Sequence, residues 1–284
     1  MTASKDIQEL ATSRGKYTLP FTEEEVARLR NQHEWIKGCC GGLLKAPVDL
    51  TRKGQRVLDS ATADGYWMFD MQKLMPEGTE FVGFDIMPEL QPPPDSLPST
   101  INLQTQSLLE PFPESWQNAF DFVHQRAILP MFTKNEIIRI LAQLIGCVKP
   151  GGWIQLIEGD ASERLHDSRA EAFEMFHVFA ESNMKSPKIG RFLANYLRDL
   201  GMVNIGYEGK DFPVGISQEK PELSMRGCKN ISFVVNECMQ NSTAEKMGMS
   251  EQQWEDLPSR LESDMRKYTA AVRYHIVWAQ KPVN

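Results

Sequence analysis

Short apolar runs alternate with amphipathic stretches over residues 56–160. The apolar runs are bounded by turn residues or charges and predict strands at 57–59, 80–85, 101–106, 120–124 and 153–157. Apolar residues at helical spacing predict helices over 65–74 and 135–147. Strands that alternate with helices in this way are typical of a parallel, doubly wound α/β sheet.

The flanking segments are mostly helical in pattern. A helix is expected over 21–36, with Thr22 as its N-cap and with Gly38, Gly41 and Gly42 as the residues that break it. Further helices are expected at 168–183, 189–200 and 250–268, and a strand at 272–279. The stretch 230–239 is apolar with a mixed pattern, which predicts neither a helix nor a strand. We therefore expect residues 1–50 to form an N-terminal helical cap, and residues 51–284 to form one domain with a helical insert around 161–200.

Composition narrows the class of protein. The chain has 284 residues, 41% of them hydrophobic, which is enough to bury a sizeable core. Its 31 basic and 38 acidic residues give a net charge of −7, which disfavours nucleic-acid and membrane partners. The five cysteines form no Cys-x-x-Cys pair, so we expect a reducing compartment and no metal site. With no apolar leader or span, the expected location is cytoplasmic.

The segment from Val57 to Gly65 carries the first chemical signal. Asp59 ends an apolar strand and is followed by small residues, a layout that brings the backbone close to a nucleotide-like ligand. Asp85 ends the next strand, where such folds bind the two hydroxyls of a ribose. Both carboxylates also fit an ordinary strand end or turn.

Two alanines stand in this loop where close backbone approach usually requires glycine. Ala61 and Ala63 take positive φ angles less readily than glycine and each adds a methyl group. Either the loop keeps ordinary φ angles and the ligand lies slightly farther away, or the site has lost its ligand.

Several motifs occur in a family's order along the chain. They are the segment from Val57 to Trp67, the pair Phe84-Asp85, and the segments 110–113, 120–126 and 148–154. Together they resemble the motifs of class I S-adenosylmethionine-dependent methyltransferases, and more narrowly those of the fungal LaeA-like group associated with secondary metabolism. The resemblance is strong over roughly residues 15–160. It implies a Rossmann-like, mostly parallel seven-stranded sheet flanked by helices, with N-terminal and inserted helices capping the site.

The resemblance also implies S-adenosylmethionine as the cofactor. Asp85 would accept hydrogen bonds from the ribose, and Ser107 stands where the family often has an aspartate near the adenine. The residues expected to bind the cofactor are Asp59, Ser60, Ala61, Gly65, Asp85, Ile86, Ser107, Leu108 and Gln125. The resemblance and the charge balance together predict a small-molecule acceptor as the partner, and they leave the oligomeric state open between monomer and homodimer.

Methyl transfer from sulfur is an in-line displacement, for which an enzyme mainly supplies proximity and alignment. An oxygen acceptor often needs a general base, and His124 at the end of a strand is the candidate, with a packed core residue as the alternative. The residues expected to bind the acceptor are Tyr17, His33, Trp35, Arg126, Phe176 and His177.

The expected reaction is methyl transfer to an oxygen or nitrogen of a small, largely apolar natural product. Two alternatives stay open. The fold and cofactor could serve a cyclisation or rearrangement without methyl transfer, or the chain could be a non-catalytic regulatory protein.

Overall fold

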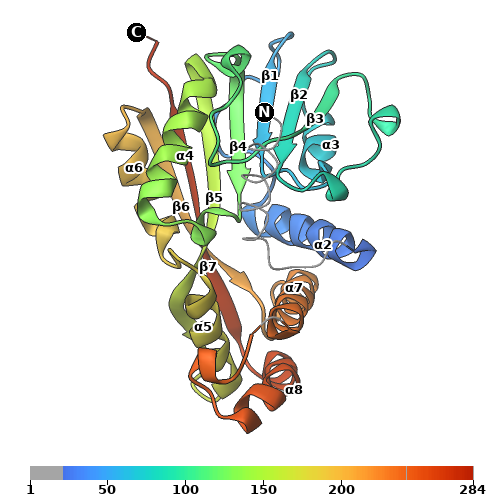
Figure 1. The fold of residues 1–284 in the computed structure, drawn as a ribbon, viewed down its shortest axis with the longest axis vertical. Helices are drawn as coiled ribbons and strands as arrows, with labels where there is room; N and C mark the ends of the chain where they lie inside the picture. Colours follow the sequence, from blue (N-terminus) through green and yellow to red (C-terminus); the bar gives the residue numbers. More distant parts are fainter. Residues whose placement is uncertain (1–21, 241, 284) are drawn as a thin grey trace, which may run out of the picture.

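The computed structural model describes residues 22–240 and 242–283, which form a seven-stranded sheet of order β3-β2-β1-β4-β5-β7-β6 (Figure 1). The strands β1 to β5 pair in parallel, and β7 runs antiparallel to both β5 and β6. The predicted doubly wound sheet is therefore confirmed. The strands are β1 (Arg56–Ser60), β2 (Glu80–Asp85), β3 (Ile101–Thr105), β4 (Phe120–Arg126), β5 (Val148–His166), β6 (Val203–Pro213) and β7 (Ala270–Gln280).

Helices cover both faces of the sheet and extend beyond its lower end in Figure 1. One apolar core lies beneath α4, and a second lies beneath α3. A third core joins α2, α5, α7 and α8 to β7. The helices are α2 (Glu23–Cys40), α3 (Tyr66–Gln72), α4 (Lys134–Cys147), α5 (Glu171–Asn183), α6 (Leu193–Asp199), α7 (Pro221–Gln240) and α8 (Glu251–Lys267). Among the described residues, none of these helices combines the length and hydropathy needed to cross a bilayer.

The start of α2 was predicted correctly and its end was not. Thr22 is the N-cap, and its hydroxyl accepts a hydrogen bond from the Glu25 amide. The helix continues past the predicted end at Ile36 to Cys40, and Gly41, one of the three glycines expected to break it, is the C-cap with a φ of 77°. A Cβ on Gly38 would lie 2.4 Å from a methyl carbon of Leu223. Gly38 therefore marks a close contact between α2 and α7 instead of a helix end.

Residues 149–152, whose sequence Lys-Pro-Gly-Gly is typical of a tight turn, lie inside β5. The register with β4 shifts from Phe120 opposite Val148 to Phe122 opposite Trp153, so residues 149–152 form a bulge in one continuous strand. Residues 203–213 and 221–240 had no predicted structure, and they form β6 and α7. The edge strand β6 shows little apolar alternation because all of its residues except Phe212 are exposed or partly exposed.

Helix α7 packs closely against its neighbours at Gly227. A Cβ at this position would lie 2.5 Å from the Pro213 carbonyl oxygen and 3.0 Å from the indole of Trp35. Backbone cannot move aside as the tip of a flexible side chain can, so glycine fixes the depth at which α7 packs against β6 and α2.

We expect Gly227→Ala to lower the free energy of unfolding by about 1–3 kcal/mol, as overpacking does. Gly146→Ala in α4 is the matched control, since its Cβ would meet only the end of the Gln117 side chain, with the amide oxygen at 3.1 Å. The control should be neutral or stabilising by up to about 1 kcal/mol. Chemical denaturation measures both, and equal effects of the two changes would contradict this account of α7.

Candidate active site

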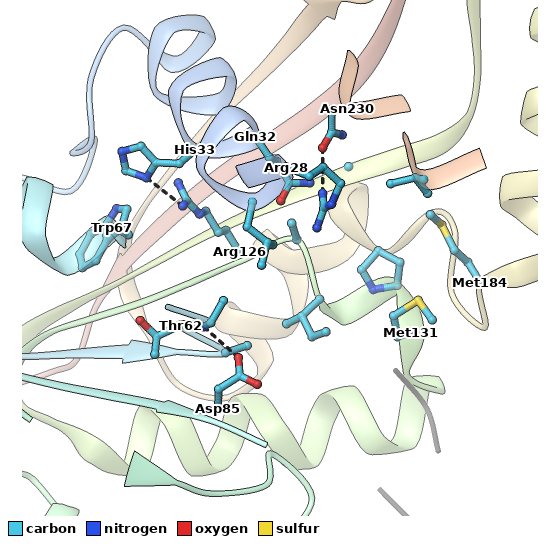
Figure 2. A pocket seen from close by; sticks show the side chains of 18 of the residues that line it. Arg28, Gln32, His33, Thr62, Trp67, Asp85, Arg126, Met131, Met184 and Asn230 are labelled. Atoms are coloured by element: carbon cyan, nitrogen blue, oxygen red, sulfur yellow. Dashed lines mark hydrogen bonds between the residues drawn. The ribbon is translucent and has the colours of Figure 1, made fainter. Parts of the chain in front are cut away.

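A cavity of about 380 Å³ lies where the carboxyl ends of β1, β2 and β4 meet helices from the second half of the chain. Loops that follow the strands line one part, and residues of α2, α5 and α7 line the other (Figure 2). Most of the lining residues are apolar, and the polar ones converge from different elements. A mostly apolar cavity with a few convergent polar groups is the usual form of a small-molecule site.

The loop after β1 takes a backbone conformation usual for glycine, although it contains alanines. Ala61 has a φ of 54° and Ala63 a φ of 52°, and Gly65 follows with 78°. Of the two alternatives left open for this loop, the one with ordinary φ angles is therefore wrong. A left-handed conformation costs an L-residue about 1–2 kcal/mol, so the surrounding structure must hold the loop in this shape.

Hydrogen bonds to β2 supply that restraint. The Thr62 amide donates to the Phe84 carbonyl oxygen at 3.0 Å, and the Ala63 amide donates to Asp85 Oδ2 at 2.9 Å. The Thr62 hydroxyl donates to Asp59 Oδ2 at 2.6 Å. The loop is thus tied to the ends of both β1 and β2.

Asp85 presents a half-buried carboxylate to the cavity. Its Oδ2 accepts from Ala63, and its Oδ1 accepts from the Met87 amide at 3.0 Å. Burial raises the pKa of this carboxyl above its usual value, and the backbone amides oppose that shift. A carboxylate has about four acceptor positions, so each oxygen can still accept a hydroxyl.

His33 and Arg126 meet at the cavity wall. Arg126 Nη2 lies 2.9 Å from His33 Nδ1 (Figure 2). On the other side of the ring, His33 Nε2 lies 3.0 Å from Asp70 Oδ2. An arginine can only donate, so Nδ1 is the acceptor and Nε2 carries the proton. Burial, and the positive charge of Arg126, lower the pKa of His33 to about 4. The imidazole is therefore neutral near pH 7.

The opposite end of the cavity is an apolar chamber with one polar edge. Met131, Phe176 and Met184 lie on its apolar side. On the polar side Arg28 Nη1 donates to Asn230 Oδ1 at 2.8 Å, a bond that joins α2 to α7 (Figure 2). This end suits a ligand with a large apolar surface.

Residues 31–207 match a family model described as a methyltransferase domain. The chain belongs to this family. It is similar to N-methyltransferase verN of Clonostachys rogersoniana, with 41% identity over 96% of each chain. It is also 31% identical to N-methyltransferase sirN of Leptosphaeria maculans, over 98% of each chain.

Solved structures agree on the fold of this methyltransferase. The cyclase SpnF matches with a TM-score of 0.50 and 15% identity over 89% of this chain and 93% of that one. Phosphoethanolamine N-methyltransferase 2 of Haemonchus contortus, solved with S-adenosyl-L-methionine, matches with a TM-score of 0.50 and 14% identity over 81% of this chain and 49% of that one. The chain is a class I methyltransferase of the type found in fungal secondary metabolism, and S-adenosylmethionine is its cofactor.

The structure brings most of the predicted site residues to the cavity. Those that line it are His33, Trp35, Asp59, Ala61, Asp85, Ile86, Ser107, Leu108, Arg126 and Phe176. Three expected cofactor residues, Ser60, Gly65 and Gln125, do not line it. Gln125 faces away from its neighbours on β4 and donates to Glu158 Oε1 at 2.5 Å. Tyr17 lies outside the described residues.

Ser60 and Gly65 are close to the loop, but burial and packing account for these two residues, not contact with the cavity. Ser60 is 1% exposed in the interior of the sheet. A Cβ on Gly65 would lie 3.3 Å from a methyl carbon of Met68 and 3.4 Å from one of Leu103. This glycine therefore provides both a positive φ and room for the start of α3.

His124 is a core residue and does not line the cavity. It is fully buried, its Nδ1 lies 2.8 Å from Asp59 Oδ1, and its ring stacks on Trp67 at 3.9 Å. Burial lowers the pKa of its imidazole. The sequence placed it correctly at the end of β4 but could not show that α3 covers it. This geometry corrects the expectation of a base at the reaction site.

His177 also lies behind the cavity wall. Its Nδ1 lies 2.7 Å from the Ala161 carbonyl oxygen, and its ring stacks with His166 at 5.4 Å. Phe176, one position earlier on α5, does line the cavity, because consecutive helical residues point in directions about 100° apart. His177 was expected to bind the acceptor, and the structure places it outside the lining of this cavity.

Several lining residues were missed by the sequence reasoning. Those from α7 share one helical face, at positions 230, 231, 234 and 238. Their three- and four-residue spacing is the signal that could have identified this helix. Others come from distant elements, namely Arg28, Gln32, Met131, Met184 and Tyr274.

Ala63→Gly should raise the free energy of unfolding by up to about 1 kcal/mol. Glycine relieves about 1–2 kcal/mol of left-handed strain and costs roughly 0.5–1 kcal/mol in backbone entropy. Ala194→Gly in α6 is the control and should lose about 1 kcal/mol. Chemical denaturation of the two variants checks this, and an equal loss in both would contradict the strain at Ala63.

His124→Phe should lower the free energy of unfolding by about 1–3 kcal/mol, because Asp59 loses a buried hydrogen-bond partner. Turnover at saturating cofactor should fall by far less than the roughly 100-fold that loss of a general base costs. Denaturation and initial rates on the same preparation measure both. A large loss of turnover at unchanged stability would restore His124 as the base.

Proposed function

We propose that this methyltransferase transfers a methyl group to a nitrogen of a small, largely apolar molecule. The observation that carries the proposal is that one continuous cavity joins the strand-end loops to the apolar chamber. A cofactor at the strand ends would face an acceptor in the chamber. The described fold thus offers proximity and alignment, the main requirements of methyl transfer.

The cofactor half of the cavity suits S-adenosylmethionine. Asp85 would accept the ribose hydroxyls with the lone pairs that the backbone amides leave free. Ile86, Ser107 and Leu108 would surround the adenine, and the left-handed loop from Ala61 would pass beneath the methionine part. When bound, the cofactor supplies a methyl group activated on a positively charged sulfur.

Three relatives support nitrogen as the methylated atom. The proteins verN and sirN are named N-methyltransferases, and so is tcpN of Claviceps purpurea, which is 32% identical over 91% of this chain. The placement of the histidines gives further support. Among the described residues, His33 is the one histidine on the cavity wall, and both of its ring nitrogens are engaged. A neutral amine nitrogen can attack with its lone pair, without prior loss of a proton.

The chamber residues would orient the acceptor. Met131, Met184 and Phe176 offer adaptable apolar contacts, and Asn230 offers an amide at the polar edge. The relatives are named as methyltransferases, which favours methyl transfer over a cyclisation and over a non-catalytic regulatory role.

The test uses S-adenosylmethionine with a deuterated methyl group and a pair of apolar acceptors that differ only in a nitrogen or a hydroxyl group. We expect the nitrogen compound alone to gain the label, since no free histidine lies at the wall to activate a hydroxyl. Mass spectrometry detects the transfer, and NMR locates the labelled methyl group. A label on oxygen would refute the nitrogen assignment, and a rearranged product without label would point to the cyclisation alternative.

A further inference from the structure

Arg126 is a cation in the cavity wall, and it has no paired anion among residues 22–240 and 242–283. Its one hydrogen bond among the described residues goes to the neutral His33, and no carboxylate oxygen of those residues lies within 4.0 Å of its guanidinium. The two aspartates of the nearby loop are engaged elsewhere. Asp64 pairs with Arg30 at 2.8 Å, and Asp59 bonds to His124. Arginine stays charged in proteins, and a charge removed from water is costly unless it is paired.

His33 fixes this guanidinium without neutralising it. The neutral imidazole accepts from Arg126, and its own N–H donates to Asp70. The charge of Asp70 is in turn engaged by Lys37 Nζ at 2.7 Å and Lys73 Nζ at 3.1 Å. The Arg126 guanidinium therefore keeps a fixed place and a full positive charge, a combination that suits the recognition of an anion.

The strand order places this cation relative to Asp85. Arg126 ends β4 and Asp85 ends β2, and β1 runs between the two strands. Neighbouring strands lie about 4.8 Å apart, so the two ends are separated by roughly 10 Å across the loop after β1. The ring of His33 meets Tyr66, the first residue of α3, edge to face at 5.0 Å. Arg126 and Asp85 thus lie on opposite sides of the loop after β1.

We propose that Arg126 binds the carboxylate of the cofactor's methionine part, and that His33 is its positioning residue. The proposal rests on the proposed function, which puts the ribose at Asp85 and the methionine part over the loop. A guanidinium matches the planar shape of a carboxylate and binds it with two parallel hydrogen bonds. An acidic group of the acceptor is the other possible source of this chemistry.

Two ligands separate the contribution of the carboxylate from the rest of the cofactor. S-Adenosylhomocysteine carries the carboxylate, and S-adenosyl-3-thiopropylamine lacks it but keeps the adenosine, the sulfur and the amine. Calorimetry with the full chain should show that Arg126→Gln lowers the affinity for S-adenosylhomocysteine about 10- to 100-fold. This is the usual effect of losing charge-assisted hydrogen bonds. The decarboxylated ligand should bind the variant as well as the wild type or better, because a positive charge near its amine is gone.

Control variants test separately the binding role of Arg126 and the positioning role of His33. Asp85→Asn should weaken both ligands equally, because both carry the ribose. His33→Phe should weaken S-adenosylhomocysteine alone, and less than Arg126→Gln does. In His33→Asn the amide oxygen stands close to the place of Nδ1 and can accept from Arg126, so part of the lost affinity should return.

Three results would overturn the proposal. Unchanged affinity of Arg126→Gln for S-adenosylhomocysteine would leave the acceptor's acidic group as the partner of Arg126. An equal loss of both ligands would show a general disturbance of the cavity, as would a His33→Phe variant that loses both. If the wild-type protein binds neither ligand, the proposed function itself fails, which is a different outcome from either of these.

Discussion

The hydrogen bond from the Ala63 amide to Asp85 joins the two strand ends on which the cofactor site depends. It holds a left-handed residue in place and fixes the direction of a carboxylate, so each restrains the other. A second hydrogen bond, from the Thr62 amide to the Phe84 carbonyl oxygen, restrains the same loop. These tertiary contacts hold the loop in a shape that glycine would adopt through its own conformational freedom. The alanines therefore keep the loop shape that glycines give at lower local cost.

The cofactor half could be predicted from sequence because its residues follow directly after strands. Asp59 and Asp85 each stand in or at the end of an apolar run, and parallel strands bring such ends together. Arg126 also ends a strand, but the sequence predicted an acceptor contact for it. Whether a side chain at a strand end is covered or reaches the cavity could not be predicted in the same way. His124 and Arg126 share one face of β4, but Trp67 covers the first and the cavity reaches the second.

The acceptor half could not be predicted because its walls come from elements with weaker patterns. Helix α7 was missed because polar residues and a glycine interrupt its apolar face, and Gly227 was needed for a close contact that no local pattern reveals. The edge strand β6 exposes most of its side chains, so burial left little alternation in its sequence. Side chains that meet across such elements, such as Arg28 and Asn230, are 202 positions apart.

Charged groups around the cavity are mostly neutralised by protein partners. Glu25 takes two hydrogen bonds from Arg28, and Asp160 Oδ2 accepts from Arg191 at 2.6 Å, which helps hold the pKa of that aspartate below its usual value. Such pairing limits the cost of placing ions beside an apolar space. Arg126 differs from these residues, because its partner His33 carries no charge near pH 7.

The close packing at Gly227 fixes the backbone of a helix whose other residues line the chamber. Ile231, Val234 and Cys238 lie farther along this helix, so their side chains shape the chamber from a fixed backbone position. The chamber can thus diverge toward new acceptors while the strand-end loops stay the same. In evolution or in protein engineering, one helical face would set the range of acceptors on a constant cofactor platform.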